Sequence, residues 1–209
     1  MIREQRSKSR RVVMEKSSQK KLSIPLLLGS CRIGSESLKV AEFILENLAA
    51  NNQIATELID LGKYNLPMLE QRLQDNSNLP FNLLQFCSKL GQADGILIVT
   101  PEYKNGYPGV LKNALDYLEP QALKYKSIGI CTVSSGSFGG LDCLAQLRLV
   151  CLALGGLPIP DKLPIANVND LFDEKGNLCD SKFTTRLESF INELVWYTEA
   201  LVNQKQLSN

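Results

Sequence analysis

The feature that most constrains the fold is a regular alternation of short apolar runs with helical patterns. Each apolar run favours a strand and is followed, directly or after a loop, by apolar residues at helical spacing. The apolar runs cover residues 22–30, 54–61, 94–103, 126–136 and 157–168, and the helical patterns cover residues 35–51, 81–93, 107–118, 141–154 and 182–203. Strand and helix repeated five times predicts a doubly wound α/β fold, with a parallel sheet between two layers of helices. A closed barrel would require eight such repeats.

The apolar runs differ in the burial that they predict. The first, third and fourth are nearly continuous in large apolar residues, which is typical of strands buried on both faces. The second alternates loosely and favours a place at or near an edge. The fifth contains three prolines and is expected at an edge, because proline cannot donate to a ladder of hydrogen bonds. Residues 62–80 contain Gly62, Pro67 and Pro80 and are expected to be mostly loop.

Length and charge limit the partners of this chain. With 209 residues it is long enough for one well-packed domain, and a second domain is not expected. Residues 1–21 carry eight Lys or Arg and two Glu, whereas the rest of the chain carries fifteen basic and twenty acidic side chains. An acidic body argues against nucleic acid as a partner. The sequence has no run of about 18 apolar residues, so we expect no membrane span.

The basic segment 1–21 permits several interpretations. Its composition favours a disordered or loosely helical tail over an arm that binds RNA or a membrane. It lacks the apolar core of a signal peptide, and its two glutamates argue against a transit peptide. Met14 could also be the true start of the protein. We predict an N-terminal extension over residues 1–21 and one domain over residues 22–204.

Cysteine and histidine usage excludes several kinds of chemistry. Six cysteines are present without a C-x-x-C pair, and the chain contains no histidine. Most of the cysteines lie in apolar runs, where an unpaired thiol behaves as a small buried hydrophobe. This usage predicts a reducing, cytoplasmic compartment. Without imidazole or paired cysteines, we expect neither a histidine-dependent triad nor a metal site.

The chemistry is expected at one edge of the sheet. In an open parallel sheet, ligands bind at the carboxyl ends of the strands, near the point where strand order reverses. Three loops follow buried strands directly: the first loop (29–37), the second loop (101–109) and the third loop (134–140). These loops are therefore the candidate site.

The first loop, GSCRIGSES, has the G-x-x-x-x-G spacing of a nucleotide P-loop. A P-loop continues with Lys and then Ser or Thr, whereas this chain continues with Ser35, Glu36 and Ser37. The missing lysine argues against a triphosphate. Amides at a helix start, three serine hydroxyls and one guanidinium suit a monophosphate that needs no metal. These donors belong to Ser30, Arg32, Ser35 and Ser37. The alternative is a helix capped by Ser35 or Ser37 without any ligand.

The second and third loops are weaker indications. The second begins with the residues PEY and contains Gly106 and Gly109, whose backbone freedom would let amides approach a planar ligand. Its alternative is an ordinary turn before a helix, with Lys112 and Asp116 as a surface ion pair. The third, SSGSFGG, offers hydroxyls and exposed amides, and its alternative is a flexible connector. Together at one sheet edge, the three loops predict a binding site.

The three loops resemble those of a known family. The segments GSCRIGS, TPEYKNGYPGVLKNALDYL and SSGSFGG…LR are similar, in the same order, to the NAD(P)H-dependent FMN reductase family. Relatives in that family include quinone, azo-dye and chromate reductases. The resemblance extends from about residue 22 to about residue 201. It implies a flavodoxin-like three-layer sandwich with a five-stranded parallel sheet in the order 2-1-3-4-5.

The resemblance also implies how the cofactor FMN is held. The first loop would bind its phosphate, the second would lie along the isoalloxazine ring, mainly through backbone groups, and the third would close the other edge of the ring. The implied cofactor-binding residues are Ser30, Arg32, Ser35, Ser37, Pro101, Glu102, Tyr103, Lys104, Asn105, Gly106, Ser134, Ser135, Gly136, Ser137, Gly139 and Gly140.

By the same resemblance, we expect an FMN-dependent oxidoreductase with NADPH or NADH as co-substrate. Hydride would pass from the nicotinamide to the flavin and on to a small-molecule acceptor such as a quinone or free flavin, so no catalytic side chain is required. A homodimer or homotetramer is implied, with the flavin near the subunit interface. The alternative is an electron carrier or FMN-binding regulatory module without turnover, and a P-loop-like phosphotransferase is a third interpretation.

Two positions depart from the family pattern. Ser37 stands where some relatives have Asn, a change compatible with phosphate binding. Asn commonly follows P-E-Y in the family, whereas this chain has Lys104 there and Asn105 next. We hypothesise that the Lys104 cation stabilises the anionic reduced flavin and raises its potential. A lysine side chain directed into solvent is the alternative.

Overall fold

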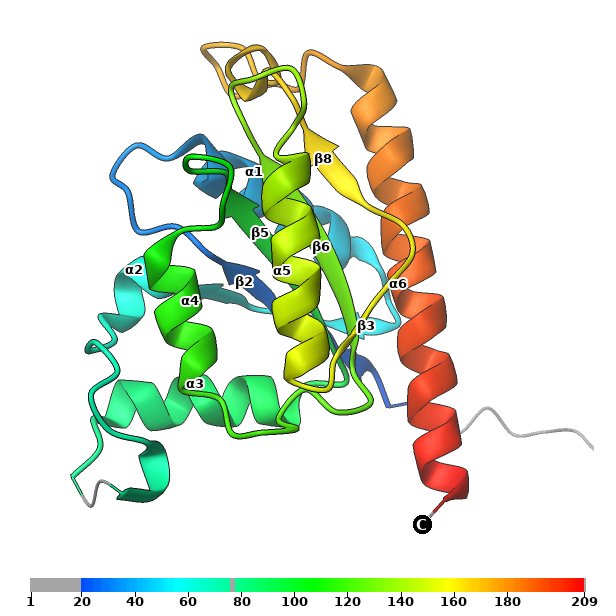
Figure 1. Cartoon of the computed structure of the whole chain (residues 1–209). Helices are drawn as coiled ribbons and strands as arrows, with labels where there is room; N and C mark the ends of the chain where they lie inside the picture. The colour runs from blue at the N-terminus through cyan, green and yellow to red at the C-terminus, as the bar shows by residue number, and fades with distance from the viewer. Residues whose placement is uncertain (1–19, 76–77, 209) are drawn as a thin grey trace, which may run out of the picture.

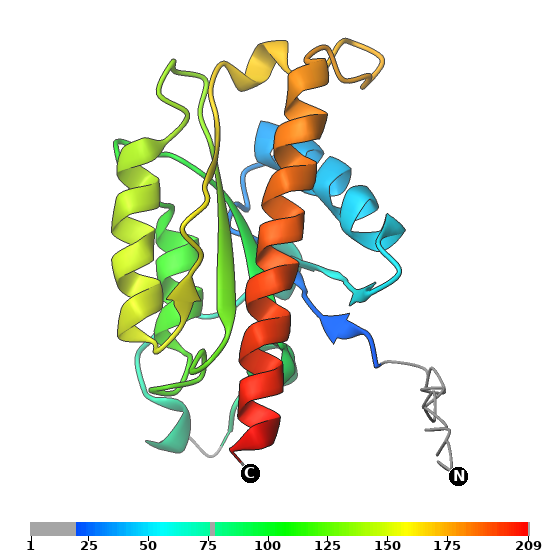
Figure 2. The same cartoon turned by 90° about the vertical axis from the view of Figure 1, so that its right-hand side faces the viewer.

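The computed structural model describes residues 20–75 and 78–208, and a sheet flanked by helices on both faces forms its centre (Figure 1; Figure 2). The strands are β1 Leu22–Ser23, β2 Leu26–Leu28, β3 Ile54–Ala55, β4 Leu58–Asp60, β5 Gly95–Pro101, β6 Ser127–Val133, β7 Leu157–Pro158 and β8 Leu163–Ile165. The α-helices are α1 Glu36–Ala50, α2 Leu61–Tyr64, α3 Phe81–Gln92, α4 Gly109–Asp116, α5 Leu141–Ala153 and α6 Ser181–Leu207. Two 3-10 turns are η1 Leu73–Asp75 and η2 Val168–Asp170.

The main sheet has the order β4-β2-β5-β6, and β7 and β8 both pair with β6 at the far edge. These strand pairs are all parallel. β5 and β6 lie in the middle and are buried at every residue, as their continuous apolar runs predict. A parallel sheet between two layers of helices confirms the predicted fold class.

The sheet contains more strand segments than the five strands expected. Leu22 of β1 faces Ile54 of β3. Leu26 of β2 pairs with Leu58 of β4, which continues the register of the β1–β3 pair. Each of these two expected strands is therefore present but interrupted. Pro25 lies at one interruption and has no N–H to donate to the ladder. When the interrupted segments are joined, the order of the sheet is the expected 2-1-3-4-5.

The expected edge strand is also interrupted. β7 and β8 are separated by residues 159–162. The guanidinium of Arg148 on α5 donates to the carbonyl of Ile159, to that of Pro160 (3.1 Å) and to that of Asp161 (3.3 Å). The interruption is therefore held against α5, and the proline-rich strand lies at the edge as predicted.

Two apolar clusters fill the two faces of the sheet. On one face α1 and α6 pack together, and Phe183 and Phe190 of α6 are fully buried there. On the other face lie α2 to α5, with Phe86 of α3 and Leu111 of α4 in the core. In Figure 2, α6 runs along one side of the sheet and α5 along the other. α1, α3 and α6 thus turn their buried apolar residues to the sheet, whereas α5 also carries exposed leucines on its outer side.

The helices predicted from the sequence are present, with some ends displaced. α1 and α3 end within one residue of the predicted bounds. α4 is shorter than expected because Pro108 is its N-cap, whereas α6 is longer because it continues to Leu207. The segment 62–80, expected to be mostly loop, also contains η1 and most of α2. The Asp60 carboxylate begins α2 by accepting a hydrogen bond from the Gly62 N–H (2.9 Å).

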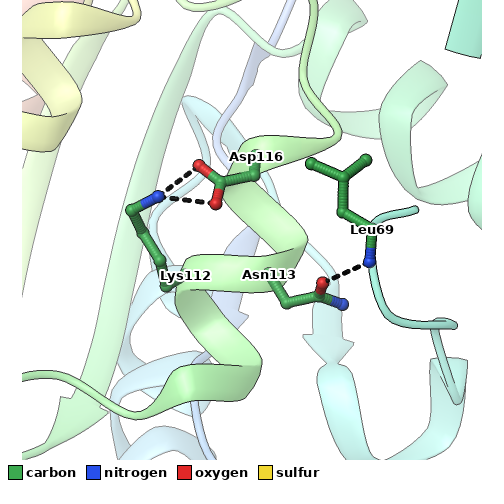
Figure 3. A network of polar contacts seen from close by, with 4 residues as sticks. All are labelled: Leu69, Lys112, Asn113 and Asp116. Atoms are coloured by element: carbon green, nitrogen blue, oxygen red, sulfur yellow. Dashed lines mark hydrogen bonds and ion pairs between the residues drawn. The ribbon is translucent and has the colours of Figure 1, made fainter. Parts of the chain in front are cut away.

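α4 fastens the loop that precedes α3. The side-chain oxygen of Asn113 accepts a hydrogen bond from the Leu69 N–H (2.9 Å), and its Nδ2 donates to the Pro67 carbonyl (2.7 Å). Figure 3 shows the contact with Leu69 and, on the same helix, the ion pair between Lys112 and Asp116. That pair confirms the surface contact expected from its i,i+4 spacing.

Residues 1–19, most of the predicted basic extension, lie outside the described residues. The division of the chain into an extension and a domain over residues 22–204 therefore stays a prediction. Within residues 20–75 and 78–208, no helix combines the length and apolar character needed to cross a lipid bilayer.

Candidate functional site

A cleft of about 120 Å³ opens at the carboxyl edge of the sheet. The loops around it follow β2, β5, β6 and β8, and strand order reverses between β2 and β5. Its lining residues are Arg32, Glu36, Ser37, Pro101, Glu102, Tyr103, Val133, Ser134, Ser135, Val168 and Asn169. The three loops singled out in the sequence therefore meet, as the rule for parallel sheets requires.

The first loop places three serines at the start of α1. The exposed fractions of Ser30, Ser35 and Ser37 are 4%, 6% and 1%. The Ser30 hydroxyl donates to Ser35 Oγ (3.2 Å) and lies 3.5 Å from the hydroxyl of Tyr103. Ser35 is the N-cap by position, but its side chain makes no capping hydrogen bond. Ser35 is therefore confirmed as the N-cap by position although its hydroxyl makes no capping bond, and Ser37 lies inside the helix.

The charged part of the first loop is exposed. Arg32 lines the cleft, and its backbone N–H donates a hydrogen bond to the Ser30 hydroxyl oxygen (3.4 Å). Gly34 turns the chain into α1 with φ of 68°. Glu36 also lines the cleft, and Lys39 donates to its carboxylate (3.0 Å). A cationic side chain and a helix start without a side-chain cap suit an anion.

The second loop is a tight turn. The Tyr103 N–H donates to the Gly106 carbonyl (2.8 Å), and the Gly106 N–H donates to the Tyr103 carbonyl (3.1 Å). The two residues between them, Lys104 and Asn105, have φ of 52° and 64°. Positive φ at both central positions is the pattern of a type I′ turn. We call residues 103–106 the Lys104–Asn105 turn.

The start of the second loop is bound to α5. Glu102 Oε2 accepts a hydrogen bond from the backbone N–H of Cys143 (3.2 Å), in the first turn of α5. A carboxylate at the positive end of the helix dipole is stabilised there. Burial, with the nearby Glu102 charge second, raises the pKa of the Cys143 thiol to about 12. That thiol is therefore neutral near pH 7 and donates weakly to the Pro101 carbonyl (3.8 Å).

The third loop approaches the second through glycine. Gly139 and Gly140 have φ of 64° and 80°. A Cβ on Gly140 would lie 3.0 Å from the Cβ of Thr132 and 3.3 Å from that of Glu102. Thr132, buried in β6, donates to the Gly139 carbonyl (2.7 Å). The loop is further held by the Asn167 N–H, which donates to the Gly136 carbonyl (3.2 Å). These contacts anchor the third loop to β6 and to the segment after β8.

A second cavity, of about 310 Å³, adjoins the cleft and shares Glu102 with it. Its other lining residues are Asn105, Phe138, Leu141 and Asp142. Phe138 is 78% exposed and Tyr103, at the cleft, is 41% exposed. Exposed aromatic rings beside a cleft provide flat apolar surface for a planar ligand.

The predicted site residues fall into four groups. Those that line the cleft are Arg32, Ser37, Pro101, Glu102, Tyr103, Ser134 and Ser135. Glu102 and Asn105 line the second cavity. Ser30 and Ser35 are buried in the first loop. Like Ser30 and Ser35, the remaining predicted residues line neither cavity: Lys104, Gly106, Gly136, Ser137, Gly139 and Gly140.

Sequence reasoning missed Glu36 and Val133 in the cleft, Phe138, Leu141 and Asp142 in the second cavity, and two further contributions. Val168 and Asn169, in η2 after β8, line the cleft. They follow the carboxyl end of the edge strand, so the same rule that found the other loops could have indicated them. Gln146 of α5 contacts the second loop, since its Nε2 donates to the Asn105 carbonyl (2.7 Å). No motif or period in the sequence indicates that contact.

Comparison with known proteins agrees with this geometry. The model of the family described as NADPH-dependent FMN reductase matches residues 22–170. The FMN-dependent NADPH-azoreductase of Staphylococcus aureus (strain USA300) is 28% identical over 174 residues, which cover 81% of this chain and 92% of the azoreductase.

Solved structures share the fold. FerB, a flavoenzyme NAD(P)H:(acceptor) oxidoreductase from Paracoccus denitrificans, is 25% identical, with a TM-score of 0.70 over 86% of this chain and 98% of FerB. The NAD(P)H:quinone oxidoreductase from Methanothermobacter marburgensis is 15% identical, with a TM-score of 0.57 over 85% of this chain and 98% of that enzyme. At 15% identity the likeness concerns the fold alone.

Proposed function

Because this chain belongs to the NADPH-dependent FMN reductase family and is therefore an oxidoreductase, we propose that it binds FMN in the cleft at the carboxyl edge of its sheet. Bound there, FMN would carry electrons from NADPH or NADH to a planar small-molecule acceptor. Quinones and free flavin are the acceptors that we propose first. An azo compound is a further candidate, in view of the Staphylococcus aureus azoreductase.

The observation that carries the proposal is the arrangement of the first loop. Three nearly buried serines surround the start of a 15-residue helix whose N-cap side chain makes no capping bond. Amides at such a helix start and the positive end of its dipole favour a phosphate. Arg32 lines the same cleft and adds a cation. The donors suit a phosphate monoester, because no lysine is present in the first loop to reach a second or third phosphate.

The remaining loops are suited to a flat ring. We propose that the isoalloxazine lies along Pro101 to Gly106 and that Ser134 to Gly140 closes its other edge. Residues 103–105 of the turn are exposed, and the exposed ring of Phe138 borders the adjoining cavity. That cavity provides room for a planar acceptor beside the flavin.

When bound, FMN supplies the two-electron chemistry, and the protein supplies binding and orientation. The serine hydroxyls and Arg32 would hold the phosphate, and the Glu102 carboxylate keeps the second loop against α5. This division of roles requires no acid or base from the protein and is consistent with a chain that contains no histidine.

We propose a homodimer or homotetramer as the assembly. The outer side of α5 supports it, because Leu149 and Leu152 are 68% and 54% exposed on a helix that borders the site. Sedimentation velocity would test the assembly, and a monomer at micromolar concentration would contradict it. A cytoplasmic location also remains a proposal, supported by six cysteines that are all unpaired.

The decisive test is the absorbance spectrum of the purified protein with added FMN. We expect bound flavin, its bleaching by NADPH or NADH, and reoxidation by a quinone. Bound flavin that neither nucleotide bleaches would support an electron carrier instead. A protein that takes up no FMN would contradict the proposed function.

Arg32→Ala tests the phosphate site. Loss of charge-assisted contacts should weaken FMN binding about 10- to 100-fold, measured by quenching of flavin fluorescence. The matched control is Arg72→Ala, since Arg72 is exposed and lies outside the cleft. Equal affinities of the two variants would contradict the assignment of Arg32.

A further inference from the structure

The Lys104–Asn105 turn holds a lysine in a conformation that lysine disfavours. Its two central residues have φ of 52° and 64°. Asparagine adopts the left-handed backbone conformation with little difficulty, whereas this conformation is unfavourable for lysine. The two hydrogen bonds between Tyr103 and Gly106 close the turn but lie within it. Contacts from outside the turn are therefore needed to keep this conformation populated.

Gln146 provides such a contact. Its Nε2 donates to the Asn105 carbonyl at 2.7 Å, although the two residues are 41 positions apart. A Cβ on Gly106 would lie 3.4 Å from Gln146 Oε1, an ordinary van der Waals distance. The carboxamide therefore lies directly against the turn.

A second contact from the same helix holds the start of the segment. The Cys143 N–H donates to the Glu102 carboxylate (3.2 Å), and Gln146 follows Cys143 by one helical turn. Residues 102 and 105 are thus both bound to the first two turns of α5. α5 fixes this segment at two points, and only one of them depends on a side chain outside the second loop.

We propose that Gln146 is a positioning residue, which keeps the Lys104–Asn105 turn in the conformation that presents its backbone to the flavin. The proposal rests on the proposed function for its consequence, because that function places the isoalloxazine along this turn. Gln146 acts through the Asn105 carbonyl, so this role requires no contact between Gln146 and the cofactor.

Gln146→Met removes the donor while keeping a long, unbranched side chain. We expect FMN binding to weaken about three- to tenfold, the effect of one hydrogen bond, while the melting temperature hardly changes because Gln146 is exposed. The matched control is Gln92→Met in α3, where an exposed glutamine bonds within its own helix. An unchanged FMN affinity in Gln146→Met would overturn the proposal.

Rescue distinguishes positioning from a direct contact with the cofactor. Lys104→Gly removes the cost of the positive φ, since glycine adopts that region freely. We expect adding Gln146→Met to Lys104→Gly to weaken FMN binding by a smaller factor than Gln146→Met weakens it in the wild type, so that most of the loss is recovered. A full, additive loss in the double variant would overturn the proposal.

A flavin-free measurement separates this inference from the proposed function. Hydrogen exchange of the Tyr103 and Gly106 amides, which close the turn, should be about three- to tenfold faster in Gln146→Met than in the wild type. The Gln92→Met control should match the wild type. If the wild type binds no FMN, the proposed function fails, but the exchange comparison still tests whether the hydrogen bond from Gln146 to the Asn105 carbonyl holds the turn. Unchanged exchange would overturn the inference.

Discussion

At the scale of single residues, the site depends on backbone angles that few side chains adopt. Positive φ occurs in all three loops, at Gly34, at Lys104 and Asn105, and at Gly139 and Gly140. These positions differ in their surroundings. A Cβ on Gly34 would meet nothing within 4 Å, whereas a Cβ on Gly140 would meet two other side chains. Glycine is therefore favoured by its backbone angle alone at Gly34, and by both angle and lack of space at Gly140.

Gly140→Ala should destabilise the protein more than Gly34→Ala. Both variants carry the cost of a left-handed alanine, about 1–2 kcal/mol. Gly140→Ala adds crowding against Thr132 and Glu102, which costs about 1–3 kcal/mol more. Urea denaturation would measure the free energy of unfolding of each variant. Equal losses would show that the neighbours of Gly140 move aside.

Lys104→Asn tests the charge in the turn. If the Lys104 cation stabilises the reduced flavin, its removal should lower the potential of bound FMN, by an amount on the order of tens of millivolts. Asparagine also suits the φ of 52° at this position, so the fold should be retained. Lys205→Asn, at the end of α6, is the control. A potential that does not move in Lys104→Asn would place the cation in solvent, away from the flavin.

At the scale of elements, helices hold the loops through single polar side chains. Asn113 of α4 binds the loop at residues 67–69, and Arg148 of α5 binds the interrupted edge strand. Both act on backbone groups that would otherwise lack a partner in a sheet or helix. Such contacts are sensitive to substitution, because a backbone group left unsatisfied in a buried place costs more than the bond contributed.

Asn113→Ala should lower the free energy of unfolding by about 1–3 kcal/mol. The variant removes both bonds to the loop, the one from Leu69 (Figure 3) and the one to Pro67. Asp116→Ala on the same helix breaks only an exposed ion pair and should change stability by less than about 0.5–1 kcal/mol. Denaturation midpoints would compare them, and similar losses would contradict a role for Asn113 in holding the loop.

At the scale of the whole molecule, titratable groups are buried on both faces of the sheet. Burial raises the pKa of Cys87 to about 11 and that of Cys151 to about 12, and it raises the pKa of Cys131 as well. Burial lowers the pKa of Lys126, whose ammonium donates to the Gly91 carbonyl (2.7 Å) and to that of Ala93, where α3 ends. At alkaline pH the thiols and the lysine therefore change the folding stability in opposite directions.

Stability should fall above about pH 9. The ordinary thiol pKa is 9.0, so the unfolded chain loses thiol protons from that pH upward while the folded protein keeps them to about pH 11 or 12. The folded state then binds more protons, and unfolding becomes easier as pH rises. Lys126 opposes this, because its lowered pKa makes stability rise with pH up to its ordinary value of 10.5.

Several thiols should outweigh one amine. Denaturation in reductant at pH 7.5, 9 and 10 should therefore show a steady loss of stability. Cys151→Ala, compared with its own value at pH 7.5, should show a smaller loss than the wild type. A wild-type stability that rises from pH 7.5 to 10 would mean that Lys126 dominates.

The sequence by itself determined the fold class and the place of the site. Continuous apolar runs must be buried on both faces, and parallel strands need helical crossovers, so five repeats lead to a doubly wound sheet. Because the strands are parallel, their carboxyl ends share one edge, and loops far apart in the sequence meet there. Arg32, Glu102 and Ser134 could therefore be assigned to one cleft from their positions after strands.

Only the tertiary structure decided which side chains hold that site in shape. The Ser35 hydroxyl is engaged by Ser30 and does not cap α1, and Gln146 reaches a carbonyl 41 residues away. Each contact depends on the direction of a side chain and on the register between packed elements. A helical or strand period specifies which face of an element is buried, but it carries no information on which distant backbone group will lie within hydrogen-bond distance of one side chain.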